Sequence, residues 1–142
     1  MSAFKIYSLD VGLLRRLSGL TPSAIAEGNR LLTEFKGALT ENYVLESLVG
    51  QFGNVLKYWT SGNRAEVDFI MQIENDIIPI EVKSDQNVTG KSLAFYRKEF
   101  SPKISIRYSL KNLKQDGDLI NIPLFMADMT DSIIKLAMLN SD

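Results

Sequence analysis

The amino-acid sequence predicts an α/β domain in which helices flank a mixed central β-sheet. Two changes of hydrophobic period support this prediction. Apolar residues recur at three- and four-residue steps over about 30–52, which indicates a helix, whereas from residue 55 they alternate, which indicates strands. A second helical pattern interrupts the strands at 90–100. With 142 residues, 45% of them hydrophobic, the chain suits one domain with a sizeable core.

The N-terminal part is predicted to form a short strand followed by three helices. Asp10 is placed to cap the first helix, Pro22 suits the first turn of the second, and Gly53 follows the third. The predicted bounds are 4–9 for the strand and 11–17, 21–27 and about 30–52 for the helices.

The remainder is predicted to hold five strands and two helices. Thr130 is placed to cap the last helix. The helix over 90–100 joins two strands as a right-handed βαβ unit, so these strands should be parallel neighbours. The predicted strands are 55–59, 65–73, 78–84, 103–110 and 119–123, the helices are 90–100 and 131–139, and 111–118 is a polar loop.

The strands over 65–73 and 78–84 are predicted to form a hairpin that separates apolar from charged side chains. A turn at 75–76 would pair Phe69 with Val82. Side chains alternate across a strand, which gives the hairpin two faces. The core face carries Val67, Phe69, Met71, Ile78, Ile80 and Val82, and the opposite face carries Asp68, Ile70, Gln72, Pro79, Glu81 and Lys83.

The charged face of this hairpin is a candidate metal site. In the predicted register Asp68 and Glu81 are diagonal neighbours about 7–8 Å apart at Cα, so both carboxylates can reach one divalent ion. Lys83 would lie beside the ion and stabilise negative charge on a phosphate. On the long helix, Glu41 flanks the apolar stripe and Glu46 lies nearer its centre, which offers a third carboxylate. The alternative is an amphipathic hairpin whose charges simply face water.

The composition limits the chemistry that such a site can perform. The sequence has no His and no Cys, which excludes thiol and histidine catalysis and zinc sites built on these residues. Any metal ion must therefore be bound by oxygen, which favours Mg²⁺, Mn²⁺ or Ca²⁺.

The charge is nearly balanced overall but locally basic. A net charge of −1 argues against strong nonspecific nucleic-acid binding. The segment 91–114 is nevertheless basic, and it is either a solvated face or a surface that contacts phosphate. It carries Lys91, Arg97, Lys98, Lys103, Arg107, Lys111 and Lys114, against Glu99 alone.

Four strings in this order resemble a known family: KIYSLDVGLL, GALTENYVLESL, YWTSGNRAEVDFI and IPIEVKS. Over about residues 4–125 they are similar to the C-terminal domain of uncharacterised function in prokaryotic AAA+ family ATPases. The spacing from Glu41 to Asp68, and then to Glu81-x-Lys83, also resembles the PD-(D/E)xK nuclease superfamily.

The resemblance implies a restriction-endonuclease-like core, with Glu41, Asp68 and Glu81 as metal ligands and Lys83 as the catalytic lysine. It implies DNA cleavage with Mg²⁺ or Mn²⁺, in a domain joined to the ATPase module of the same parent chain. Further candidates carried over from the superfamily are Glu46, Lys91, Ser92 and Tyr96. Two alternatives stay open: a nuclease fold that binds DNA or protein without cutting, and a structural appendage that scaffolds the ATPase or its homo-oligomer.

Three expectations concern the chain as a whole. It resembles an excised C-terminal fragment of a larger ATPase, with residues 1–142 forming one domain. It contains no apolar run long enough to span a membrane, so a cytoplasmic location is expected. The segment 85–92, DQNVTGKS, approaches a phosphate-binding loop, but Asp85 replaces the first Gly, so ATP binding is not expected.

Overall fold

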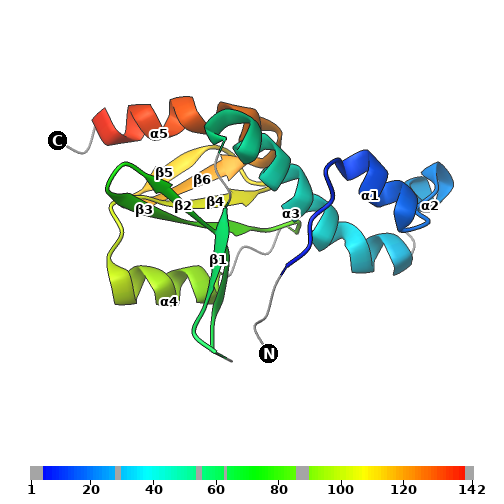
Figure 1. Cartoon of the computed structure of the whole chain (residues 1–142), viewed down its shortest axis with the longest axis horizontal. Helices are drawn as coiled ribbons and strands as arrows, with labels where there is room; N and C mark the ends of the chain where they lie inside the picture. Colours follow the sequence, from blue (N-terminus) through cyan, green and yellow to red (C-terminus); the bar gives the residue numbers. More distant parts are fainter. Residues whose placement is uncertain (1–4, 28–29, 54–55, 63, 86–89, 140–142) are drawn as a thin grey trace.

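The central sheet of the computed structural model has six strands in the order β1-β2-β3-β4-β6-β5 (Figure 1). The structure describes residues 5–27, 30–53, 56–62, 64–85 and 90–139, with the backbone alone for 24, 25, 27 and 30–34. β3 pairs with β4, and β4 with β6, in parallel, whereas the other neighbours are antiparallel. The strands are β1 Lys57–Thr60, β2 Glu66–Ile73, β3 Asp76–Val82, β4 Ser105–Ser109, β5 Lys114–Asp116 and β6 Leu119–Pro123.

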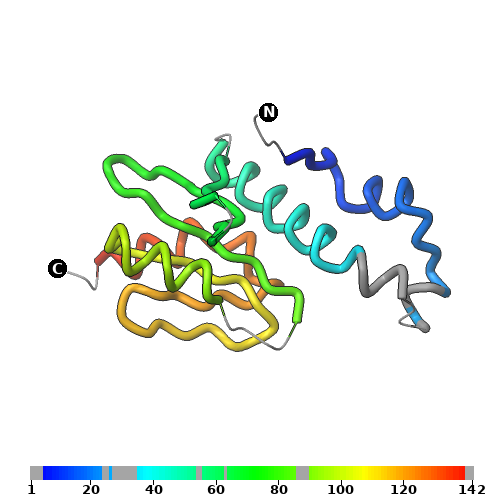
Figure 2. The backbone as a smooth tube through the Cα atoms, turned by 90° about the horizontal axis from the view of Figure 1, so that it is seen from below, coloured from blue at the N-terminus to red at the C-terminus, as the bar shows by residue number. Residues whose placement is uncertain are grey.

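Helices cover both faces of this mixed sheet, which confirms the predicted α/β class (Figure 1). Helices α3 and α5 and the 3-10 helix η1 lie over one face, and α4 lies over the other, against β2 and β3. The short helices α1 and α2 lie beside the N-terminal half of α3 (Figure 2). The bounds are α1 Val11–Leu17, α2 Pro22–Glu27, α3 Arg30–Phe52, α4 Lys91–Phe100, η1 Leu124–Met129 and α5 Thr130–Leu139.

Two predicted signals explain where helix α1 begins and where helix α3 ends. The Asp10 Oδ1 accepts a hydrogen bond from the Leu13 N–H at 2.7 Å and so caps α1. Gly53 follows α3 with a φ of +64°, a left-handed conformation that glycine adopts without strain. None of the helices in the described ranges is long and apolar enough to cross a membrane.

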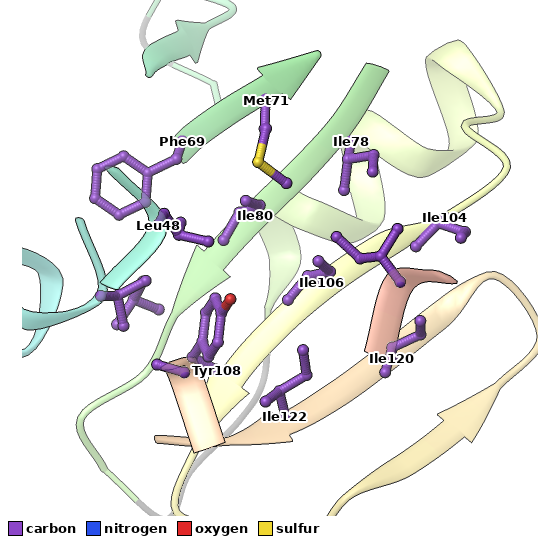
Figure 3. Packing of buried hydrophobic residues seen from close by; sticks show 14 of the residues in the cluster. Leu48, Phe69, Met71, Ile78, Ile80, Ile104, Ile106, Tyr108, Ile120 and Ile122 are labelled. Atoms are coloured by element: carbon purple, nitrogen blue, oxygen red, sulfur yellow. The ribbon is translucent and has the colours of Figure 1, made fainter. Parts of the chain in front are cut away.

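The hydrophobic core lies between the sheet and the layer formed by α3, η1 and α5 (Figure 3). All six apolar residues predicted for the core face of the hairpin are buried. Phe69 and Met71 of β2 and Ile78 and Ile80 of β3 belong to this core, and Leu48 of α3 lies beside Phe69 and Ile80. Full burial of such a side chain stabilises the fold by about 2 kcal/mol, so this face fixes the orientation of the hairpin.

The predicted register of the hairpin is wrong by two residues. The turn lies at 74–75 instead of 75–76, and Phe69 therefore pairs with Ile80 instead of Val82. Because side chains alternate along a strand, a shift of two residues leaves every side chain on its predicted face. The prediction of which residues share a face is thus confirmed although the pairing is not.

The other predicted helices and strands are present within two residues of their predicted bounds, except the strand over 4–9. Two further predictions, the loop over 111–118 and the Thr130 cap, are also wrong. Residues 5–9 form no strand, because the Ser8 N–H donates to the Asn42 side chain of α3 instead of to a neighbouring strand. The predicted loop 111–118 contains the edge strand β5. Thr130 does not cap α5, because η1 precedes the helix and the Thr130 hydroxyl donates to the Ala127 carbonyl at 2.6 Å. Residue 55 of the predicted strand 55–59 lies outside the described residues.

Candidate functional site

Asp68, Glu81 and Lys83 lie together at one end of the β2–β3 hairpin, on the face opposite the core. Continuing the observed register places Asp68 opposite Glu81. The Asp68 Oδ2 accepts a hydrogen bond from the Val82 N–H at 2.8 Å, so this carboxylate is bound to the backbone between the other two charged residues. The Lys83 Nζ lies 3.3 Å from the Glu81 Oε1, which confirms that these side chains share a face.

Glu81 is buried, with 2% of its surface exposed, and each of its carboxylate oxygens contacts a cation. The parallel pairing of β3 with β4 sets Glu81 beside Arg107, whose Nε lies 3.2 Å from the Glu81 Oε2. Lys83 contacts the other oxygen. Gly90 packs against the ion pair so closely that a Cβ at this position would lie 2.0 Å from the Glu81 Oε2. Two cationic partners compensate the cost of burying this carboxylate.

Glu41 reaches the same region from α3. Its Oε2 accepts a hydrogen bond from the Tyr7 O–H at 3.4 Å and lies 3.9 Å from the Lys5 Nζ. The same Lys5 nitrogen lies 3.9 Å from the Asp68 Oδ1 and 2.5 Å from the Glu66 Oε1. The Lys5 ammonium therefore lies among three carboxylates and links Glu41 of the helix to Asp68 of the sheet.

Burial and neighbouring charges shift the pKa values in this group. Burial raises the pKa of Asp68 from 3.8 to about 6, and the charge of Glu41 adds to this effect, whereas the backbone hydrogen bond and nearby ammonium groups oppose it. Burial lowers the pKa of Lys5, but the hydrogen bond to Glu66 and the nearby carboxylates outweigh burial, so this pKa is raised. A carboxyl group whose pKa lies near neutrality is typical of functional sites.

The carboxylates of Glu41 and Asp68 are suited to bind a cation, because an oxygen of each already lies 3.9 Å from one ammonium nitrogen. Carboxylate oxygens are also the ligands that Mg²⁺ and Mn²⁺ prefer. Glu81, the third predicted ligand, has both oxygens in ion pairs instead. In the part of the chain that the structure describes, no three acidic side chains are arranged to hold a metal ion. Glu41 and Asp68 thus lie at the Lys5 ammonium, whereas Glu81 is held by adjacent ion pairs.

The remaining predicted site residues make other contacts. The Glu46 Oε1 accepts a hydrogen bond at 2.7 Å from a side-chain amide one turn earlier on α3. The Ser92 Oγ accepts a hydrogen bond from the Glu66 N–H at 3.2 Å, which places Ser92 beside one of the three residues whose carboxylates surround Lys5. Tyr96 is buried and packs against the single tryptophan ring of β1, with ring centroids 5.0 Å apart. Lys91 is exposed at the first position of α4. Ser92 therefore contacts the backbone of a residue whose carboxylate pairs with Lys5.

The basic stretch of the sequence is partly neutralised within the domain. Arg97, Lys103 and Arg107 each form an ion pair with an acidic residue of the chain. The exposed Lys111 and Lys114 instead line a pocket of about 340 Å³ next to Arg107, together with one acidic side chain. This pocket therefore offers a cationic wall that begins at the Glu81 ion pair.

Four residues of the site were not predicted to belong to it: Lys5, Glu66, Gly90 and Arg107, the last of which was predicted only as part of the basic segment 91–114. Glu66 carries an available signal, because it lies two residues before Asp68 and so shares its face. The contacts of the other three join segments far apart in the sequence, and no local pattern indicates them. The four residues from Gln86 to Thr89, within the loop-like string 85–92, lie outside the described residues.

Fold and site together define an α/β domain with buried and half-buried charged residues at one end of its central hairpin. The chain belongs to the family described as Domain of unknown function (DUF4143), whose model matches residues 36–125. The predicted site residues Glu41, Asp68, Glu81 and Lys83 all lie inside this matched region. Lys5 lies outside it.

The curated relatives are uncharacterized. The chain is 36% identical over 80 residues to Uncharacterized protein Mb2031c of Mycobacterium bovis and to Uncharacterized protein Rv2008c of Mycobacterium tuberculosis. The match covers 56% of this chain but 17% of either relative, so it spans less than a fifth of their length. No solved structure gave a significant match.

Proposed function

We propose that this domain is a nuclease-like module of an AAA+ family ATPase, with a restriction-endonuclease-like core, and that it hydrolyses DNA phosphodiester bonds with Mg²⁺ or Mn²⁺. The observation that carries the proposal is the meeting of Glu41, Asp68, Glu81 and Lys83, from a helix and two strands, at one end of the hairpin. The cytoplasm is the location proposed with this function.

The residues present support this chemistry by their type, and Glu41 and Asp68 support it also by their position at one cation. Glu41 and Asp68 would hold the ion, with Glu81 as the third ligand on the adjacent strand. Such an ion lowers the pKa of a bound water and polarises a phosphoryl oxygen. Lys83, which is a third exposed, would donate to the phosphate oxygen on which negative charge develops.

A cleavage assay tests the proposal. Supercoiled, branched and single-stranded DNA are incubated with the protein in Mg²⁺ or Mn²⁺, beside the variants Asp68→Asn and Lys83→Ala. We expect each variant to lose activity by a factor of about 100 or more, the usual contribution of a positioned catalytic group. The matched control is Lys103→Ala, which removes a lysine that pairs with Asp76. Absence of cleavage by the wild type, or equal cleavage by all variants, overturns the proposal.

A second candidate function is DNA binding without cleavage, and the ion pairs on both oxygens of Glu81 favour it. The cationic pocket beside Arg107 would then contact the phosphate backbone through Lys111 and Lys114. Anisotropy of labelled DNA in EDTA tests this reading. We expect Lys111→Ala combined with Lys114→Ala to weaken binding and to reduce the dependence of affinity on salt, whereas Lys135→Ala should leave both unchanged.

A further inference from the structure

The pairing of four strands lines up one row of polar side chains across the sheet. Glu81 of β3 pairs with Arg107 of β4, and Arg107 pairs with Asn121 of β6. Asn121 in turn pairs with Lys114 of the edge strand β5. Residues that pair in neighbouring strands project from the same face of a sheet. The row therefore runs from the candidate site to the edge of the sheet, on the face where α4 lies against β2 and β3.

The outer part of this row lines the pocket of about 340 Å³ beside Arg107. Its lining includes three cationic side chains, those of Arg107, Lys111 and Lys114, and among the described residues one acidic side chain, that of Asp116. Arg107 shares the Glu81 carboxylate with a second cation, the Lys83 ammonium, so its charge is not fully compensated by that pair. Positive charge therefore exceeds negative charge in the lining, which favours an anionic ligand.

Asn121 fixes the loop that forms the outer wall of the pocket. Its side-chain nitrogen donates to the carbonyl of Lys111 at 3.2 Å and to that of Asn112 at 3.0 Å. Its side-chain oxygen accepts a hydrogen bond at 2.7 Å from the hydroxyl of the buried Ser109, which itself accepts from the Lys111 N–H at 3.1 Å. These bonds hold the loop backbone in place, so little conformational entropy is lost when the wall contacts a ligand.

The lining suits a phosphate group that carries a small organic substituent. A phosphate monoester has a charge of about −1.5 to −2 at pH 7 and accepts strong hydrogen bonds from lysine and arginine. The volume lies at the lower end of the range for small-ligand sites, about 300–1,000 Å³, which is more room than a phosphate ion needs. Leu119 and the aliphatic stems of Lys111 and Lys114 offer an apolar surface to a sugar or a base.

We propose that this pocket binds the phosphate monoester of one nucleotide, either as a free mononucleotide or as the phosphorylated end of a DNA strand. The choice of a nucleotide rests on the proposed function. Because neighbouring strands are about 4.8 Å apart, Lys114 lies about 14 Å from Glu81 across the sheet. A DNA strand held by its end in the pocket would pass Arg107 on the way to the candidate site.

Anisotropy of a short, internally labelled oligothymidylate in EDTA tests binding of a DNA end. One version carries a 5′-phosphate, one a 3′-phosphate and one a hydroxyl at both ends. We expect one phosphorylated version to bind at least about tenfold more tightly than the hydroxyl version, because its terminal phosphate adds charge-assisted hydrogen bonds. Lys111→Gln and Lys114→Gln should each remove most of this preference, whereas Asp116→Asn should increase it. Lys135→Gln, which removes a lysine paired with Asp131 on α5, is the matched control and should keep the preference.

Calorimetric titration in EDTA tests binding of a free nucleotide, with dTMP, thymidine and inorganic phosphate as the three probes. We expect the wild type to bind dTMP but not thymidine, which lacks the phosphate. Inorganic phosphate should bind at least about tenfold more weakly than dTMP, because it makes no contact with the apolar surface. Lys111→Gln and Lys114→Gln should weaken dTMP binding, and Lys135→Gln should not.

The outcomes distinguish the two sources of the phosphate monoester. An end preference assigns the pocket to DNA ends, and dTMP binding without an end preference assigns it to free nucleotides, so either result supports the inference. The inference is overturned if neither occurs, if Lys111→Gln and Lys114→Gln bind like wild type, or if inorganic phosphate binds as tightly as dTMP. Equal binding of the three oligothymidylates without dTMP binding also overturns it and indicates contact with the DNA backbone instead.

These measurements are independent of the proposed cleavage, because EDTA removes divalent ions and no step requires a cut. A protein that cleaves DNA but shows neither an end preference nor dTMP binding supports the nuclease and rejects the pocket. A protein that cuts no DNA but binds dTMP or a phosphorylated end through Lys111 and Lys114 supports the pocket and rejects the nuclease.

Discussion

Asp68 of β2 accepts a hydrogen bond from the backbone N–H of Val82 in β3, at 2.8 Å. Val82 lies between Glu81 and Lys83, so this bond fixes the Asp68 carboxylate against the strand that carries the other two charged residues of the site. The second oxygen of Asp68 faces Lys5 at 3.9 Å. Asp68 therefore has one oxygen with a structural role and one oriented toward the cation.

The raised pKa of Asp68 predicts a specific dependence of stability on pH. The pKa is about 6 in the folded protein and 3.8 ordinarily, so between these values the folded state binds the proton and the unfolded state does not. The contribution of Asp68 to stability is therefore present in full below pH 3.8 and is lost as the pH rises through 6. This corresponds to about 3 kcal/mol, since one pKa unit is worth about 1.4 kcal/mol.

Urea unfolding of wild type and Asp68→Asn in EDTA, between pH 4 and pH 7, measures this effect. The variant has no titrating group at 68 and keeps an oxygen that can accept from Val82. Its free energy of unfolding should rise relative to wild type as the pH increases. A difference between the two proteins that stays constant with pH contradicts the prediction.

The Glu81–Arg107 pair predicts strong coupling between two substitutions. Arg107→Met leaves the buried Glu81 with Lys83 alone, and Glu81→Gln leaves Arg107 without its carboxylate. Each should lower the free energy of unfolding by about 3 kcal/mol, because an unpaired buried charge remains. The double variant should lose less than the sum, by about 1–3 kcal/mol.

Urea unfolding of the four proteins in this cycle gives the coupling energy. The surface pair of Lys135 and Asp131 provides the comparison, since exposed pairs one helical turn apart couple by about 0.5 kcal/mol or less. Additive effects at Glu81 and Arg107 would show that the buried ion pair contributes no coupling.

The hairpin illustrates how much of the fold and site the sequence could predict. Alternation of apolar and charged residues is a local property, and it correctly places Asp68 and Glu81 on one face and Phe69 on the other. The exact pairing depends on the turn, where Glu74 adopts a φ of +51°. A left-handed conformation is uncommon for glutamate, so the composition favours a turn one residue later. This error leaves every side chain on its predicted face, because it shifts the register by two residues.

The rest of the site follows from tertiary structure. Arg107 meets Glu81 because β3 and β4 are parallel neighbours in one particular register, which the predicted βαβ unit does not define. Lys5 meets Asp68 because the N-terminal segment is held on α3 through Asn42. Neither contact has a periodic pattern, so the sequence predicts Glu41, Asp68, Glu81 and Lys83 but not the contacts of Arg107 and Lys5 with them.

Close packing at Gly90 predicts a destabilising effect of one methyl group. A Cβ at Gly90 would lie 2.0 Å from the Glu81 Oε2 and 2.7 Å from an Arg107 nitrogen, so Gly90→Ala must displace the ion pair. We expect a loss of about 1–3 kcal/mol, the usual cost of overpacking. Gly37→Ala is the matched control, because Gly37 lies inside α3 with open space around it and should gain up to about 1 kcal/mol. Thermal unfolding of both variants checks the prediction, and a gain in Gly90→Ala would refute it.

The hydroxyl pair of Tyr108 and Thr130 predicts a cost for losing one buried oxygen. Both residues are fully buried, their oxygens lie 2.5 Å apart, and Thr130 donates to the Ala127 carbonyl, so the Tyr108 hydroxyl donates to Thr130. Thr130→Val keeps the shape of the side chain but leaves the Tyr108 hydroxyl without its acceptor, which should cost about 1–3 kcal/mol. Thr130→Ser retains the oxygen and loses one methyl group, so it should cost about 1 kcal/mol. Urea unfolding ranks the two variants. If Thr130→Val is more stable than Thr130→Ser, the methyl group and not the hydroxyl attaches α5 to β4. If Thr130→Val lowers the free energy of unfolding in the wild-type background but not in a Tyr108→Phe background, the hydrogen bond between the two hydroxyls attaches α5 to β4.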